Sequence, residues 1–80
     1  MDYRFSKHAL EQMDIRKISK KVVEEILIHP LQVKSQGEFK VFQSLESDKK
    51  HLIRIFVNAK NLVVTVYRTS KIRKYYEGKI

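Results

Sequence analysis

The chain has 80 residues, with 17 Lys and Arg against 9 Asp and Glu, and a formal net charge of +8. This length accommodates one domain, residues 1–80, and the absence of cysteine excludes a disulfide framework and a thiolate metal site. No apolar run approaches the roughly 20 residues that a membrane span requires, and the charged first residues are unlike a signal peptide. We therefore expect a cytoplasmic protein without membrane association. Its charge favours nucleic acid as a partner, although many small basic proteins bind none.

The first third of the sequence predicts two helices. Ser6 is suited to cap the first helix, because apolar residues follow it at helical spacing. Ser19 repeats this arrangement for a second helix. The second helix should end before Pro30, because the residue that precedes a proline disfavours helical geometry.

The spacing of the apolar residues changes to two in the rest of the sequence, which indicates strands. The predicted strands lie in the segments 31–35, 38–45, 51–57 and 62–69. Short connections between them favour antiparallel neighbours. The sequence therefore predicts an α+β fold in which two N-terminal helices pack on one face of an antiparallel sheet of about four strands. The basic, aromatic segment 71–80 receives no assignment.

One face of the predicted sheet has a composition that suits RNA. Ile53, Ile55 and Val57 should face the helices, because they alternate with polar and aromatic residues. In the last strand, the alternation groups Val63, Thr65, Tyr67 and Thr69. The face away from the helices would then show Arg54, Phe56, Thr65, Tyr67 and Thr69. This is a plausible platform for stacked bases and a phosphate, and the alternative is a half-solvated face that only reflects β-propensity.

Basic residues gather in two clusters. The first is Arg16, Lys17, Lys20 and Lys21, and the second is Arg68, Lys71, Arg73 and Lys74. Cations at the start of a helix oppose its dipole, so the first cluster is locally unfavourable and indicates a functional surface. The alternative is that these side chains point into water at a cost of a few tenths of a kcal/mol. The predicted nucleic-acid contacts are Arg16, Lys20, Lys71, Arg73 and Lys74.

The chemistry that the sequence offers needs no metal and no cofactor. His8 falls in the first turn of the first helix, where the dipole favours a neutral imidazole suited to a general base. The alternative is an exposed or locally packed histidine. His29 and His51 read as structural. Glu46, Asp48 and His51 have a spacing that suggests metal ligands, but they fall in a turn where polar residues are expected, so a metal site is not expected. A metal-free ribonuclease is compatible with these residues, because RNA supplies its own 2′-hydroxyl nucleophile and the protein moves protons and neutralises charge.

Three segments carry a resemblance to a known family. The segments FSKHALEQMDIRKIS, VVEEILIHP and VTVYRTSKIRKYY resemble a family of small prokaryotic domains with an opening Ser-x-His-Ala and a closing Val-Tyr-Arg-Thr-Ser. That family is similar to the RelE-like and BrnT-like toxin domains. The resemblance implies a RelE-like fold and a messenger-RNA endoribonuclease, the toxin of a toxin–antitoxin pair, with an acidic antitoxin protein as partner.

With this resemblance, roles follow for individual residues. We expect His8 to act as general base or acid, and Tyr67 to stack a base or share the proton transfer. Arg54 and Arg68 would stabilise the phosphorane, and the products would carry a cyclic phosphate. Gln12 stands where the family often has an arginine, and it cannot supply that charge. The resemblance also implies that the open sheet face and both basic clusters converge on one groove.

Two further functions stay open at this point. The chain could be a nucleic-acid-binding module or degenerate toxin without catalysis, which predicts salt-sensitive RNA binding and no cleavage. It could also be a protein-interaction domain whose basic surface meets an acidic partner. The leading expectation is cleavage of RNA, either free or on the ribosome.

Overall fold

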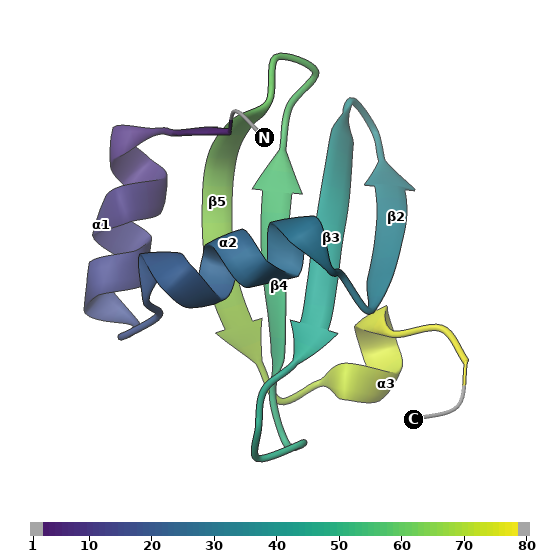
Figure 1. Ribbon diagram of the computed structural model, residues 1–80. Coiled ribbons are helices and arrows are strands. Elements are labelled where there is room, and N and C mark those ends of the chain that lie inside the picture. Colours follow the sequence, from purple (N-terminus) through teal and green to yellow (C-terminus); the bar gives the residue numbers. More distant parts are fainter. Residues whose placement is uncertain (1–2, 79–80) are drawn as a thin grey trace.

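The computed structural model describes residues 3–78, which form one five-stranded sheet flanked by helices (Figure 1). The strands are β1 (Arg4–Phe5), β2 (Gln32–Gln36), β3 (Phe39–Leu45), β4 (Leu52–Val57) and β5 (Leu62–Thr69). The helices are α1 (Lys7–Ile15), α2 (Lys20–Ile28) and α3 (Ile72–Tyr75). The strand order across the sheet is β1-β5-β4-β3-β2. None of the helices in this part of the chain is long and apolar enough to cross a membrane.

The predicted α+β class and its two N-terminal helices are confirmed, but the sheet differs from the expectation. It has five strands and is mixed, because β1 pairs in parallel with β5. The added strand forms because the residues before α1 hydrogen-bond to the free edge of β5: the amide of Arg4 donates to the carbonyl of Asn61 at 3.0 Å, and that of Ser6 to Val63 at 2.9 Å. A two-residue strand is too short to show a periodic pattern in the sequence.

Both predicted helix caps form. The Ser6 hydroxyl accepts a hydrogen bond from the amide of Ala9 at 3.0 Å, and the Ser19 hydroxyl accepts one from Val22 at 3.2 Å. These bonds satisfy amides that have no partner inside the helix. Each cap sets the start of its helix, and so sets which residues face the sheet.

The main core lies between the two N-terminal helices and one face of the sheet. In Figure 1, α2 crosses the sheet and α1 stands beside β5. Ile53, Ile55 and Val57 are buried in this core, as the alternation predicted. The helices contribute Ala9, Met13, Val23, Ile26 and Leu27 to the same cluster. We call this side of the sheet the helix face and the opposite side the open face.

A bulge changes the pattern near the end of β4. Phe56 pairs with Thr65, but Val57 pairs with Val63, so Val64 is an extra residue on β5. The extra residue reverses the alternation. The prediction that Val63 shares the open face was therefore wrong, and Val63 is fully buried in the main core.

The segment after β5 folds back across the sheet. The backbone carbonyl of Tyr75, in α3, accepts hydrogen bonds from the side chains of Lys34 and Gln43. Figure 1 places α3 at the lower end of β2 and β3. The helix partly covers the open face, where Val41 and Leu52 are fully buried outside the main core cluster. Residues 79–80 of the unassigned tail lie outside the described residues.

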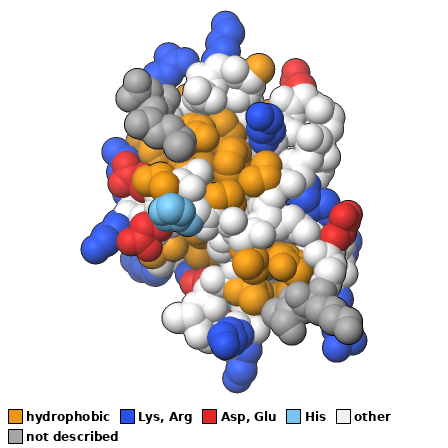
Figure 2. Space-filling model, turned by 45° about the vertical axis from the view of Figure 1, so that its right-hand side comes forward, with side chains coloured by type: hydrophobic (Ala, Val, Ile, Leu, Met, Phe, Trp, Pro, Cys, Tyr) orange, Lys and Arg blue, Asp and Glu red, His pale blue; other side chains and the backbone are white. Residues whose placement is uncertain are grey.

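The surface around the edge strand β2 is partly apolar. Ile28, Leu31 and Val33 are exposed at the junction of α2 and β2. Figure 2 brings this side of the molecule forward and shows hydrophobic side chains gathered there, with lysine and arginine side chains projecting around them.

Candidate nucleic-acid interface

A row of hydrogen-bonded side chains crosses the open face from β2 to β5. Gln32, Gln43, Arg54 and Tyr67 lie opposite one another in neighbouring strands, so their side chains share a face. The amide of Gln43 donates to Gln32 at 2.7 Å, and Arg54 Nε donates to Gln43 Oε1 at 2.9 Å. Arg54 Nη1 donates to the hydroxyl of Tyr67 at 2.7 Å. The row holds the guanidinium in one orientation.

Arg54 is a buried cation with neutral partners. It is 3% exposed, and none of the ion pairs within residues 3–78 involves it. Its guanidinium carbon lies 4.2 Å from the ring centre of Tyr75, 5.3 Å from Phe56 and 5.8 Å from Tyr67. Aromatic faces attract a cation, but they do not cancel its charge. The open face therefore has a positive charge at its centre that no carboxylate of the described chain neutralises.

Four aromatic rings follow one another across the same face. The ring centres of Phe39 and Phe56 are 6.1 Å apart, those of Phe56 and Tyr67 are 6.1 Å apart, and those of Tyr67 and Tyr75 are 6.5 Å apart. All four side chains are half-buried, so each keeps part of its surface open to solvent. Exposed rings beside a cation are the surface on which single-stranded nucleic acids stack their bases.

The phenol of Tyr75 lies among positive and polar groups. Partial burial raises its pKa, whereas Lys74, the neighbouring Tyr67 hydroxyl and Arg54 lower it. The net effect is a pKa below the ordinary value of 10.0. The lowering causes together outweigh burial, and Lys74 contributes most among them.

Polar contacts hold α3 against the open face. The Tyr75 carbonyl accepts from Gln43 Nε2 at 3.1 Å and from Lys34 Nζ at 3.2 Å. Lys34 also pairs with Glu77 at 3.0 Å, and Glu77 exchanges two backbone hydrogen bonds with the side chain of Gln32. The exposed cations of this segment therefore stand at the rim of the aromatic surface. They are the predicted nucleic-acid contacts Lys71, Arg73 and Lys74.

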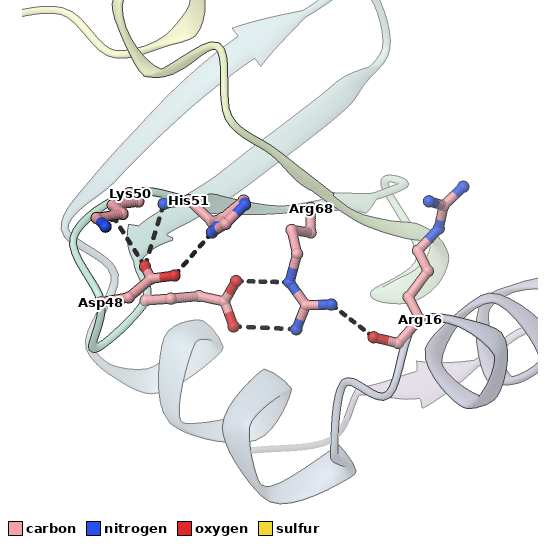
Figure 3. A network of polar contacts seen from close by, with 6 residues as sticks. Arg16, Asp48, Lys50, His51 and Arg68 are labelled. Carbon is pink, nitrogen blue, oxygen red and sulfur yellow. Dashed lines mark hydrogen bonds and ion pairs between the residues drawn. The ribbon is translucent and has the colours of Figure 1, made fainter.

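Arg68 lies on the other face of the sheet and has a carboxylate partner. It pairs with Ile53, so it points to the helix face. Its Nε and Nη2 donate to the two oxygens of Glu46 at 2.5 and 3.0 Å, and its Nη1 donates to the backbone carbonyl of Arg16 (Figure 3). The hydrogen bonds that Arg68 donates to Glu46 raise the pKa of Arg68. Arg68 thus joins β5, the end of α1 and the loop after β3.

The four residues predicted to form a catalytic centre do not come together. Arg54 and Tyr67 are in contact on the open face. His8 is exposed in the first turn of α1, and Arg68 contacts the opposite end of the same helix. Because α1 packs on the helix face, His8 and Arg68 are separated from Arg54 by the sheet.

The first basic cluster also lies on the helix side. Arg16 Nε donates to Gln12 Oε1 at 2.9 Å, so Gln12 anchors an arginine rather than a phosphate. Lys20 Nζ lies 5.2 Å from the ring centre of Phe5. Arg68 of the second cluster contacts Arg16 on this side, whereas the α3 cations stand at the open face, so the sheet divides the second cluster and the two clusters do not line one groove.

Sequence reasoning missed the roles of three residues around these sites. Gln43 orients Arg54, Glu46 neutralises Arg68, and Tyr75 covers the Arg54 guanidinium. Gln43 carries a signal, because a glutamine at the centre of a strand breaks the apolar pattern and is fully buried. Glu46 and Tyr75 lie in segments without periodicity, and only the folded chain shows their contacts.

One histidine has a carboxylate partner. His51 Nδ1 lies 2.7 Å from Asp48 Oδ2 in the turn that connects β3 and β4. Backbone hydrogen bonds from Lys50 and the bond to His51 lower the pKa of Asp48 below its ordinary 3.8. Within residues 3–78, no three His, Cys, Asp or Glu side chains are grouped so that they could hold a metal ion.

Comparison with known proteins gives one match. A family model described as "Domain of unknown function (DUF4258)" matches residues 5–68, from β1 to near the end of β5. No curated protein and no solved structure matches the chain.

Proposed function

The chain belongs to the DUF4258 family, whose description assigns no function, and we propose that it binds single-stranded RNA on its open sheet face. The observation that carries this proposal is the buried, carboxylate-free Arg54 at the centre of four aromatic rings. A buried cation without a counter-ion destabilises the fold. Its presence therefore indicates a functional role, and attracting an anionic ligand is the role that suits a positive charge.

Each part of the open face has a task in this proposal. Bases stack on the exposed sides of Phe56 and Tyr67, because every base has a face that can stack on an aromatic ring. Arg54 is too buried to touch a phosphate directly, so it orients the Tyr67 hydroxyl and adds positive potential to the surface. Phosphates meet the exposed cations at the rim: Lys71, Arg73 and Lys74.

The test is a titration of fluorescently labelled single-stranded RNA at several salt concentrations. The logarithm of the binding constant should fall linearly with the logarithm of the salt concentration, because phosphate contacts release counterions. Tyr67→Ala should weaken binding about tenfold or more through lost stacking, whereas Tyr67→Phe should bind nearly as well as the wild type. Ile15→Ala is the matched control, since Ile15 is the most exposed large apolar residue and lies at the end of α1. Equal affinity of wild type and Tyr67→Ala contradicts the proposal.

A second candidate function is metal-independent cleavage of messenger RNA by a RelE-like toxin domain in the cytoplasm. The resemblance of the opening and closing motifs supports it, and so does a histidine that a carboxylate orients, His51. Cleavage of RNA in EDTA, alone or with translating ribosomes, tests the activity. Co-purification of a small acidic protein that suppresses the cleavage tests the antitoxin. Intact RNA under both conditions leaves a binding protein without catalysis.

A further inference from the structure

The three histidines of the chain differ in what surrounds them. His8 and His29 are exposed on helix ends, and neither pairs with a carboxylate among the described residues. His51 is bonded to Asp48. We propose that His51 is the general base of an RNA-cleaving site at the β3–β4 turn, with Asp48 as its positioning residue. The proposal rests on the proposed action on RNA and names the group that would carry out the chemistry.

The turn holds the Asp48 carboxylate in place. Its Oδ1 accepts hydrogen bonds from the backbone amides of Lys50 at 2.8 Å and His51 at 3.2 Å. Its Oδ2 is left for the imidazole, 2.7 Å from Nδ1. An ionised carboxylate accepts and does not donate, so Nδ1 carries the proton in this pair. Whenever the ring is neutral, Nε2 is thus a free acceptor, which is the form that a general base needs.

The imidazole is anchored and still accessible. The carbonyl of His51 accepts from the amide of Glu46 at 2.9 Å, and the residue directly precedes β4, so its backbone is tied to the sheet. The side chain of His51 is 38% exposed to solvent, and its Nε2 has no hydrogen-bond partner among residues 3–78. A substrate hydroxyl can reach Nε2 without any rearrangement of the turn.

Two lysines accompany the acidic residues Glu46 and Asp48 in the turn. Lys49 and Lys50 are exposed within it, and Figure 3 shows His51 near Arg68, with Arg16 beyond. Glu46 neutralises Arg68, and Gln12 holds the Arg16 side chain on α1, so the charge available for a phosphate comes from the exposed Lys49 and Lys50. These cations meet the requirement that negative charge growing on the phosphate be stabilised.

The turn also lies within reach of an RNA strand on the open face. His51 precedes Arg54 by three residues, which corresponds to about 10 Å along a strand. His51 lies on the helix side, because Glu46, its neighbour across the two strands, binds Arg68 there, so a strand that stacks on Tyr67 would bend around the end of β4 to reach it. The open face would then supply binding, and the turn would supply the chemistry.

The reaction is an internal transesterification of RNA. The 2′-hydroxyl gives its proton to His51 Nε2, and its oxygen forms a bond to the adjacent phosphorus. The bond from phosphorus to the 5′-oxygen breaks, and that oxygen takes a proton from water. The imidazolium returns its proton to the resulting hydroxide, so the products are a 2′,3′-cyclic phosphate and a 5′-hydroxyl end.

The test compares two histidine variants in EDTA, with free RNA and with translating ribosomes. His51→Gln should lower the cleavage rate about 10²- to 10⁴-fold, the usual contribution of a general base. His29→Gln is the matched control, because His29 is also exposed but has no carboxylate partner among residues 3–78, and it should cleave like the wild type. RNA affinity measured in parallel should be unchanged in both variants. Cleavage by His51→Gln at the wild-type rate overturns the proposal, whatever the control variant does.

Two further measurements separate catalysis from a structural role. Asp48→Asn still accepts the amide bonds of the turn, but its amide group faces the ring and favours the wrong tautomer, so its rate should lie between those of the two histidine variants. Added imidazole should restore part of the activity of His51→Gly, which a purely structural role would not allow. If the wild type binds RNA but never cleaves it, this proposal fails while the proposed RNA binding stands. If it does not bind RNA either, both fail.

Discussion

Arg54 and Arg68 lie in neighbouring strands and have opposite surroundings. Arg54 points to the open face, where it is buried among aromatic rings and neutral hydrogen-bond acceptors. Arg68 points to the helix face, where Glu46 binds it through both oxygens and the end of α1 gives it a third acceptor. The two side chains have the same chemistry, so the face of the sheet decides which arginine stabilises the fold and which one leaves its charge available to a ligand.

The largest expected effect is on RNA binding by Arg54. Arg54→Leu should lower the RNA affinity by about tenfold or more, because it removes the central positive charge and releases the Tyr67 hydroxyl. It should also destabilise the fold by about 1–3 kcal/mol, because the oxygen of the buried Gln43 loses its donor. Titration of labelled RNA and chemical denaturation measure the two effects. As the partner experiment, Arg68→Leu should lower the free energy of unfolding and leave the RNA affinity of the folded protein unchanged. If Arg68→Leu weakened RNA binding and Arg54→Leu did not, the contrast between the two arginines would be wrong.

A smaller effect is expected from the ion pair of Arg68. Glu46→Gln should lower the free energy of unfolding by about 1 kcal/mol, since the pair is bidentate but partly open to solvent. The loss should shrink at high salt, because salt screens the pair in the wild type. Urea denaturation at two salt concentrations measures it. A salt-independent loss would mean that Glu46 contributes through packing rather than charge.

The smallest effect concerns the end of α1, where Arg68 binds. Lys17 follows this helix with φ of +57°, a left-handed conformation that costs a side chain energy and suits glycine. Lys17→Gly should therefore stabilise the protein by about 0.5–1 kcal/mol, because glycine adopts this conformation without strain. Thermal denaturation measures the change. Arg16 should stay in place, because the amide of Ile18 still donates its hydrogen bond to the carbonyl of Met13 at the end of the helix. RNA affinity should therefore be unchanged.

Much of the fold was predictable from local patterns. Ser6 and Ser19 begin the helices as expected, and the alternation of Ile53 and Ile55 placed the main core correctly. β1 could not be predicted, because a strand of two residues forms only when β5 is already present as its partner. The reversal at Val63 was equally hidden, because a bulge depends on how two strands pair and not on the residues of either alone.

The candidate site was predictable only in part. Alternation along each strand grouped Arg54 with Tyr67, and their contact follows from the register of β4 and β5. Alternation along the strands could not show where His8 lies relative to Arg54 and Tyr67, because the direction in which α1 packs is a property of the whole fold. The bond between Asp48 and His51 was visible as a spacing, but a turn must close before that spacing becomes a contact.

Charge, helix starts and the alternation along an unbroken strand are local properties, because each depends on the identity and spacing of residues within a few positions of one another. Counter-ions are different. Whether an arginine is neutralised depends on which distant side chain the fold brings to it, and here Glu46 reaches Arg68 while no carboxylate of the described chain reaches Arg54. The amino-acid order therefore specified a basic α+β domain with a cationic, aromatic strand surface. The packing of the strands and helices selected which of its cations remained unpaired.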